Sequence, residues 1–464
     1  MAFSSTIFIF IFMPIVFGLI YLIPKIKFQN YILLISSLIF YSWGEPVYVF
    51  LMIEMVLINY LLAFSFNTKD KNVRRGYLIL SIMINVGILI IFKYTGFILD
   101  NFNDLFNLNI PIPTLAFPLG ISFFIFHMIS YLVDVYRGQA APEKNFFKLL
   151  LYISFFPKLI SGPIVKYIDI ENQIDDREVS FDKVSKGINK FIIGLSKKIL
   201  IANTTGKIVE TIFNLNAYDI TTPLAWLGAI AYCIQLYFDF SGYSDMAIGL
   251  ASMAGFDLKE NFNYPYISKS IKEFWRRWHI SLSSWLRDYV YIPLGGNRKG
   301  KHRTNINLMI VFLLTGIWHG ASWTFIVWGL FHGTFIMLEN YKIINLEKWK
   351  HSFFKHGYVI LVVIVGFVLF RAKDFHQTYT FLSKMFYDFN FNSSYTLEIL
   401  DKKTFLAILI GIVCSTPILQ KVKSFIIFKK FFIEAGFIIS LGLFIICILF
   451  ISTSTYNPFV YFKF

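Results

Sequence analysis

The stretch FSSTIFIFIFMPIVFGLIYLIPKIK, from Phe3 to Lys27, decides the fold class. Its apolar run matches the length of a membrane-spanning helix, because a bilayer core of about 30 Å requires roughly 20 apolar residues. The stretch has neither the basic start nor the small-residue cleavage site of a signal peptide. We therefore interpret it as a retained first span, at about residues 3–23.

The composition extends this reading to the whole chain of 464 residues. It is 56% hydrophobic and 15% charged, with a mean hydropathy of +0.61, whereas an average soluble domain is about 25% charged. Apolar runs of spanning length recur from end to end. Further spans are predicted at 30–43, 48–66, 77–95, 117–136, 305–320, 322–340, 357–371, 404–420 and 431–452.

Three segments are less regular. Residues 147–165 contain Pro157, Gly162 and Pro163, which break a helix, so we predict a re-entrant segment buried in protein. Residues 183–213 mix lysines with apolar positions and are predicted to be partly interfacial. Residues 223–254 form a long apolar stretch that DFSGYSD is expected to interrupt.

Together these features predict an all-α polytopic integral membrane protein with about eleven transmembrane helices plus re-entrant and amphipathic segments. We treat 1–464 as one domain, with N-terminal spans in 1–137, a core in 138–345 and C-terminal spans in 346–464.

Basic residues in the connections give an orientation. They follow the first, third and fifth predicted spans, whereas the connections after the second and fourth carry none. The positive-inside rule then places the N-terminus outside and the basic stretch 256–304 in the cytoplasm. The same rule accounts for the net charge of +15 without nucleic acid.

The sequence TGIWHGASW, Thr315–Trp323, places His319 inside a predicted span. Ionisable groups within a span are costly and tend to mark function. Gly316 and Gly320 remove bulk and let another chain or a substrate approach, and Trp318 and Trp323 offer rigid walls. Burial disfavours the imidazolium, so a neutral imidazole could act as a general base. The alternative is a packed, hydrogen-bonded structural histidine.

His279 lies in EFWRRWHISLSSWLRDY, Glu273–Tyr289. Read as one continuous helix, this stretch mixes tryptophan and arginine as interfacial helices do. It is either a cytoplasmic amphipathic helix or one wall of an entrance from the cytoplasm. Arg276, Arg277 and the basic residues up to Arg303 could meet lipid phosphates or attract a polyanionic substrate such as a coenzyme thioester.

Two acidic residues, Asp239 and Asp245, lie within an apolar stretch. They could pair with arginine, accept hydrogen bonds from broken backbone or orient a histidine. His127 and His332 are expected to be structural. The cysteines, Cys233, Cys414 and Cys447, are interpreted as small apolar residues because they lie in apolar runs without CxxC spacing. HExxH, GxSxG and nucleotide-binding patterns are absent from the sequence, and we expect neither a metal nor a cofactor.

Four ordered stretches resemble the membrane-bound O-acyltransferase family, within it the alginate O-acetylation branch. The resemblance is dense over 117–335. The stretches are FPKLISGPIVKY, YFDFSGYSDMAIGLASMAGF, NFNYPYISKSIKEFWRRWHISLSSWLRDYVYIPLGGNRKG and FLLTGIWHGASWTFIVWGLFHG.

This resemblance implies a ring of helices around a thin centre, where tunnels from both faces meet. The family's signature histidines would be His319, regarded as catalytic, and His279 on the cytoplasmic side. The donor would be a cytoplasmic acetyl thioester, acetyl-CoA, and the acceptor an exported polysaccharide reached through an extracytoplasmic SGNH-type partner at the bacterial cytoplasmic membrane. We assign substrate contacts to Arg276, Arg277, Trp278, Trp318, Trp323 and Asp245.

Other readings stay open. A related branch transfers D-alanine to a cell-wall polymer. A transporter could use His319, Asp239 and Asp245 as a relay, although the sequence shows no paired repeats with matching broken helices. A non-catalytic scaffold for an exported polymer is the third alternative.

Overall fold

The computed structural model describes residues 1–424, 436–453 and 456, and every regular element within these residues is a helix. The chain divides into two compact units. The first comprises residues 1–191 and 246–259, and the second comprises 192–245 and 260–464.

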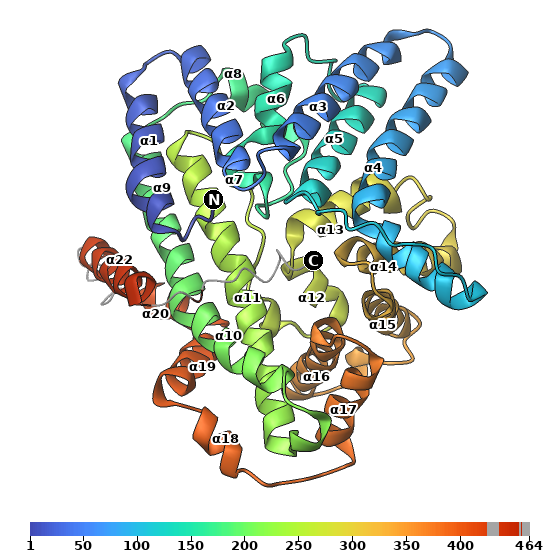
Figure 1. The fold of residues 1–464 in the computed structure, drawn as a ribbon, viewed down its shortest axis with the longest axis vertical. Helices are drawn as coiled ribbons and strands as arrows, with labels where there is room; N and C mark the ends of the chain where they lie inside the picture. The colour runs from blue at the N-terminus through green and yellow to red at the C-terminus, as the bar shows by residue number, and fades with distance from the viewer. Residues whose placement is uncertain (425–435, 454–455, 457–464) are drawn as a thin grey trace. The chain divides into compact units, whose positions relative to one another are not determined.

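The first unit contains the N-terminal helices (Figure 1). α5 is buried along almost its whole length, and Phe8, Phe40 and Phe156 pack together in the unit's core. The elements are η1 (Phe8–Phe12), α1 (Met13–Leu22), α2 (Ile26–Ser42), α3 (Tyr48–Phe64), η2 (Ser65–Asn67), α4 (Lys71–Phe106), α5 (Ile121–Tyr136), α6 (Phe146–Ser154), α7 (Phe156–Leu159), α8 (Tyr167–Asp175) and most of α9 (Phe181–Ser196).

The predicted break in 147–165 is confirmed, because α6 ends at Ser154 and α7 begins at Phe156. The freed backbone is satisfied inside the protein, where the Phe156 N–H donates to Ser37 Oγ at 3.0 Å. Pro157 lies in the first turn of α7, where a missing N–H costs nothing.

The second unit contains the remaining elements (Figure 1). They are η3 (Lys197–Ala202), α10 (Asn203–Phe213), η4 (Ala217–Asp219), most of α11 (Thr222–Met253), η5 (Pro265–Ile267), α12 (Ile271–Arg277), α13 (Ile280–Leu286), η6 (Arg287–Tyr291), α14 (Gly300–His319), α15 (Trp323–Asn340), η7 (Leu346–Lys348), α16 (Ser352–Arg371), α17 (Phe375–Phe386), α18 (Ser394–Ile399), α19 (Lys402–Cys414), α20 (Ile418–Ser424) and α22 (Gly436–Thr453).

The predictions about the helices α11 and α4 are wrong. α11 is one continuous helix, so DFSGYSD does not interrupt it. Its glycine there serves packing instead, since a Cβ on Gly242 would lie 2.8 Å from the Gly194 carbonyl oxygen. α4 extends well beyond 77–95, because Asp70 accepts hydrogen bonds from the first backbone N–H groups and the helix ends only at Asn107, with φ 50°.

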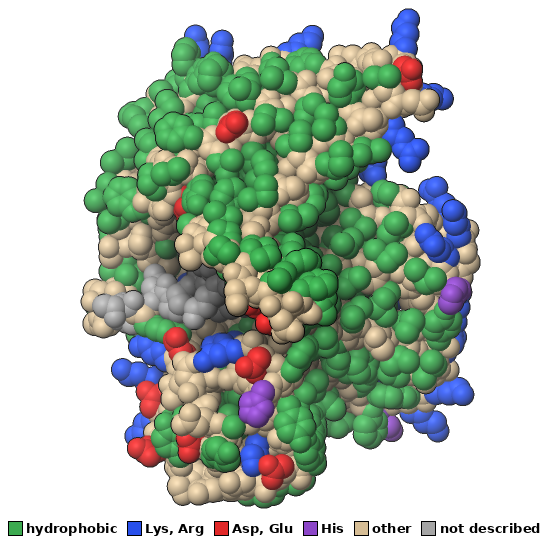
Figure 2. All heavy atoms as spheres, turned by 45° about the vertical axis from the view of Figure 1, so that its right-hand side comes forward, with side chains coloured by type: hydrophobic (Ala, Val, Ile, Leu, Met, Phe, Trp, Pro, Cys, Tyr) green, Lys and Arg blue, Asp and Glu red, His purple; other side chains and the backbone are tan. Residues whose placement is uncertain are grey.

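Among the described residues, five stretches are long and apolar enough to cross a membrane: Tyr48–Asn67, Lys71–Phe106, Thr222–Met253, Ser352–Arg371 and Gly436–Thr453. Phe8–Leu22 and Ile121–Tyr136 are shorter apolar stretches. The total of about eleven spans stays a prediction, and the start of the predicted span 431–452 lies outside the described residues. Figure 2 shows many hydrophobic side chains on the visible face, as expected of a protein that meets lipid.

Candidate active site

His319 is the last residue of α14 and is buried among aromatic rings from three helices. Trp318 lies beside it with ring centroids 4.9 Å apart. Trp328 of α15 lies at 5.0 Å and Phe370 of α16 at 5.1 Å, both nearly perpendicular to the imidazole. Edge-to-face packing of this kind fixes a ring in one orientation. The histidine is therefore held where α14, α15 and α16 meet.

The glycines around His319 bring α14 and α15 together. A Cβ on Gly316 would lie 2.4 Å from the Phe325 carbonyl oxygen, and one on Gly329 would lie 2.3 Å from that of Phe312. A Cβ on Gly320 would strike the Phe325 ring at 2.3 Å. Of the two uses predicted for Gly316 and Gly320, approach of another chain segment is the one observed. The space beside both glycines is filled by α15.

His279 lies at a break between α12 and α13, so the prediction of one continuous helix through Glu273–Tyr289 is wrong. The backbone φ of His279 is 46°, in the left-handed region. This conformation ends α12, and the chain changes direction before α13 begins. The ring is buried, packs at 4.6 Å against Phe240, and places Nδ1 3.2 Å from Asn261 Oδ1. Burial lowers the pKa of His279 to about 3, which keeps the imidazole neutral.

Trp318 lies beside both histidines. Its indole centroid is 6.3 Å from the His279 ring and 4.9 Å from the His319 ring. Trp278 is buried and stacks on Phe274, with ring centroids 5.6 Å apart. Trp323 begins α15 with 53% of its surface exposed. Of the three tryptophans assigned to substrate, Trp318 therefore has the closest relation to the two histidines.

The two acidic residues of α11 are each paired with a lysine. Asp239 lies 2.6 Å from Lys198, and Asp245 lies 2.6 Å from Lys197. The lysines are consecutive in the π-helical turn η3, and this turn directs both side chains toward α11. Sequence reasoning noted lysines among apolar residues here but did not join them to these carboxylates.

A cavity of about 820 Å³ opens along α12, α13, α14 and α15. Thr315, one turn before His319 on α14, is among its lining residues, as is Trp275. Arg277 is instead bonded to Glu273 at 2.9 Å and to the Asn263 carbonyl at 3.1 Å. The cationic residues that line this cavity are Lys272, Arg276, Arg287 and Lys301.

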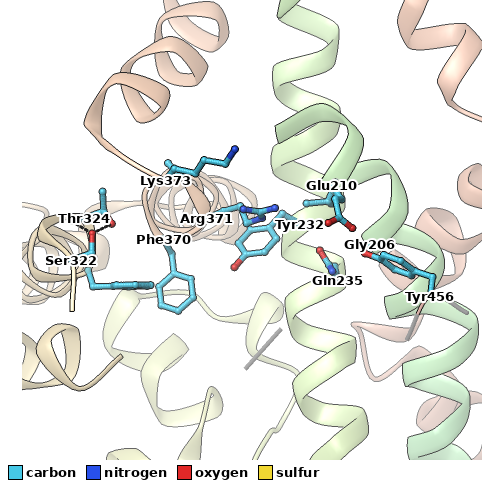
Figure 3. Close-up of a pocket in the computed structure, with 13 residues that line it drawn as sticks. Gly206, Glu210, Tyr232, Gln235, Ser322, Thr324, Phe370, Arg371, Lys373 and Tyr456 are labelled. Atoms are coloured by element: carbon cyan, nitrogen blue, oxygen red, sulfur yellow. Dashed lines mark hydrogen bonds between the residues drawn. The ribbon is translucent and has the colours of Figure 1, made fainter. Parts of the chain in front are cut away.

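A second cavity, of about 260 Å³, is built by α10, α11, α15 and α16 (Figure 3). The ring of Phe370, which packs on His319, also lines this cavity, so one aromatic ring separates it from the histidine. Sequence reasoning missed this cavity; the signal was the basic FRAK at the end of the span 357–371. Its polar lining residues include Glu210, Tyr232, Gln235, Ser322, Thr324, Arg371 and Lys373.

Residues 139–382 match the model of the membrane-bound O-acyltransferase family. The chain is 43% identical over 392 residues to a probable alginate O-acetylase of Pseudomonas putida, covering 83% of this chain and 80% of the relative. It is 36% identical to a peptidoglycan O-acetyltransferase of Helicobacter pylori, with 82% and 79% covered. It is 33% identical over 284 residues to a teichoic acid D-alanyltransferase of Bacillus subtilis, with 56% of this chain and 70% of the relative covered.

Proposed function

The chain belongs to the membrane-bound O-acyltransferase family and is an O-acyltransferase, and we propose that it moves an acetyl group from cytoplasmic acetyl-CoA for O-acetylation of an exported polysaccharide. The relatives named for alginate and peptidoglycan acetylation support acetyl as the acyl group, since they match over 82–83% of this chain. The relative named for D-alanyl transfer matches over 56% and supports that alternative less well.

His319 is the proposed general base. It accepts the proton of the acceptor hydroxyl while that oxygen attacks the thioester carbonyl, forming a tetrahedral oxyanion. The carbon–sulfur bond then breaks, and the leaving thiolate takes the proton back from the imidazolium, giving an O-acetyl ester and free coenzyme thiol. We assign stabilisation of the oxyanion to the Trp318 indole N–H, an assignment supported by its position beside both histidines.

The observation that carries this proposal is that two neighbours of His319 line two different cavities. Thr315, one turn away, lines the larger cavity, which we call the donor-side cavity, and Phe370, packed on the imidazole, lines the smaller one. A transferase needs two substrates to reach one base from different directions, whereas a structural histidine does not. This arrangement supports catalysis over a purely structural role.

The charges support a donor on the basic side. The four cationic side chains of the donor-side cavity would meet the coenzyme phosphates, and 256–304 is the most basic connection, which the positive-inside rule assigns to the cytoplasm. In this orientation the N-terminus is outside the bacterial cytoplasmic membrane. The cavity beyond Phe370 would then face outward and receive the acceptor hydroxyl, from the polysaccharide or from an SGNH-type partner protein.

The test uses the full chain in liposomes with radiolabelled acetyl-CoA and a hydroxyl-bearing acceptor oligosaccharide. We expect His319→Ala to lower acetyl transfer about 10²- to 10⁴-fold, the usual contribution of a general base. His302→Ala is the matched control, because His302 lies exposed near the start of the same helix. Full transfer by His319→Ala would make the histidine structural, and acetate movement without ester formation would favour a transporter.

A further inference from the structure

The side chain of Asn261 holds His279 through a set of buried hydrogen bonds. Its Oδ1 lies 3.2 Å from His279 Nδ1 and accepts from Ser281 twice, from the backbone N–H at 3.1 Å and from Oγ at 2.9 Å. Its Nδ2 donates to Ser244 Oγ of α11 at 3.1 Å. All four residues are buried, so water does not compete for these bonds.

These contacts fix which way the amide points. A backbone N–H can only donate, so the Asn261 atom that faces the Ser281 N–H must be the oxygen. The amide nitrogen is then the atom that meets Ser244. A flipped amide would bring two donors together at Ser281, and the geometry excludes it.

The orientation of the amide decides the tautomer of His279. Nδ1 faces an oxygen that can only accept, so Nδ1 must carry the hydrogen. Ser281 Oγ lies 3.5 Å from Nδ1 but cannot protonate it instead, because its single hydrogen is committed to Asn261 Oδ1 at 2.9 Å. In the neutral ring Nε2 then carries the lone pair.

Backbone hydrogen bonds near Asn261 also hold the break between α12 and α13, where His279 lies. The Ile280 N–H donates to the Asn261 carbonyl at 2.9 Å, and the Asn263 N–H donates to the Arg277 carbonyl at 3.0 Å. These two bonds bracket His279, whose left-handed φ of 46° costs on the order of 1 kcal/mol for a residue other than glycine. The fold thus maintains a strained backbone conformation at His279, and this conformation sets the direction of the imidazole ring.

We propose that Asn261 is a positioning residue that fixes the Nδ1–H tautomer of His279, so that Nε2 accepts a hydrogen bond from an N–H or O–H group of the substrate. The part played by substrate rests on the proposed acyl transfer; the tautomer does not. The low pKa that burial gives His279 agrees with a neutral, accepting ring. Phe240, packed edge-on at 4.6 Å, restricts rotation of the ring away from Asn261.

The tautomer can be read directly by solid-state NMR of ¹⁵N-histidine-labelled protein in lipid bilayers. The His279 signals are assigned by their loss in His279→Gln. We expect a protonated Nδ1 and an unprotonated Nε2 in the wild type, and a mixture of tautomers in Asn261→Ala. Asn263→Ala, two residues away with an exposed side chain, is the control and keeps the wild-type spectrum. A protonated Nε2 in the wild type, or an unchanged Asn261→Ala spectrum, overturns the proposal.

A near-isosteric change guards against misfolding of the alanine variant. Asn261→Asp keeps an accepting oxygen but adds a negative charge, which favours the imidazolium and raises the pKa of His279. The acid limb of the kcat/KM profile should then shift to higher pH by about one unit or more, and Asn263→Asp should leave it in place. An unshifted limb in an active Asn261→Asp enzyme counts against the proposal. A wild-type protein without any transfer activity would overturn the proposed function. The NMR spectrum would still decide the tautomer of His279 in that case.

Discussion

Lys198 and Asp239 form an ion pair at 2.6 Å in which the two side chains are only 4% and 2% exposed. One residue earlier in η3, Lys197 pairs with Asp245 at the same distance, but these side chains are 25% and 13% exposed. The two pairs share their chemistry and differ in burial, so they form an internal comparison. A buried charge that loses its partner cannot be hydrated by water, whereas a partly exposed one can.

Asp239→Ala should therefore destabilise the protein by about 3–5 kcal/mol, the usual cost of breaking a buried pair. Asp245→Ala should lower the free energy of unfolding by clearly less than this amount. The double variant Lys198→Met/Asp239→Leu, which removes both charges, should recover much of the loss. Thermal unfolding of the purified variants in one detergent measures all three. Equal losses at the two aspartates would contradict the role assigned to burial.

The close approach of α14 and α15 gives a second prediction. Gly329→Ala places a methyl group 2.3 Å from the Phe312 carbonyl oxygen, so the helices must separate and the rings around His319 must shift. We expect lower thermal stability and at least a tenfold loss of acetyl transfer, a size typical of a misplaced base. Gly87→Ala in α4 is the control, because a Cβ there meets no atom within 4 Å. Matching activities of the two variants would show that the contact is not needed.

Phe370 offers a test of how the two cavities are kept apart. Removing its ring in Phe370→Ala opens the smaller cavity onto His319, and water can then replace the acceptor hydroxyl. We expect release of free coenzyme to exceed ester formation several-fold. Phe354→Ala, an exposed ring on the same helix, provides the comparison. A thiol reagent measures the released coenzyme, and a radiolabel measures the ester formed. Equal amounts of the two products in Phe370→Ala would exclude a role for the ring as a barrier to water.

The basic side chains of the donor-side cavity give a fourth prediction. Arg276→Ala and Lys301→Ala should each raise KM for acetyl-CoA, and the effect should shrink at high salt because phosphate contacts are screened. S-acetyl-pantetheine lacks the nucleotide phosphates, so its KM should stay unchanged in the same variants. Lys350→Ala, an exposed lysine outside the cavity, is the control. Equal effects on both donors would assign these residues to something other than phosphate recognition.

The neutral state of His279 predicts how stability depends on pH. Burial lowers its pKa to about 3 in the folded protein, against about 6.5 when unfolded. The unfolded chain therefore binds more protons between these values, and stability falls as pH decreases through this window. From pH 7 to pH 5 we expect this group to contribute a loss of about 2 kcal/mol. Thermal unfolding of His279→Gln should show a smaller loss of stability at acid pH than the wild type. Identical dependence of stability on pH in the two proteins would contradict this prediction.

The sequence predicted most of what depends on local runs of residues. The lengths of apolar stretches located the helices α2, α3, α5 and α16, and the broken segment after α6 followed from proline and glycine. The break at His279 was not predictable this way, because Trp278 and His279 carry no glycine or proline signal. It is imposed by bonds to Asn261 and Asn263, which lie outside the helix.

Partners distant in the chain were also beyond sequence reasoning. The two aspartates within the apolar stretch of α11 indicated that cationic side chains lie nearby. Which cations pair with them depends on the π-helical turn that contains Lys197 and Lys198. The histidine at the end of α14 was a clear candidate from its neighbours in sequence. Its relation to Phe370, about fifty residues later, depends on how α16 packs and leaves no local pattern.

The division of the chain has a consequence for biosynthesis. The first unit needs residues 246–259, although its other part ends at residue 191. It therefore cannot close until the ribosome has delivered residue 259, and by then the start of the second unit has already been made. A protein that matures strictly one domain after another exposes few unfinished surfaces, whereas this chain must hold an incomplete first unit in the bilayer during synthesis. Until residue 259 has been added, this incomplete unit exposes surface that favours aggregation.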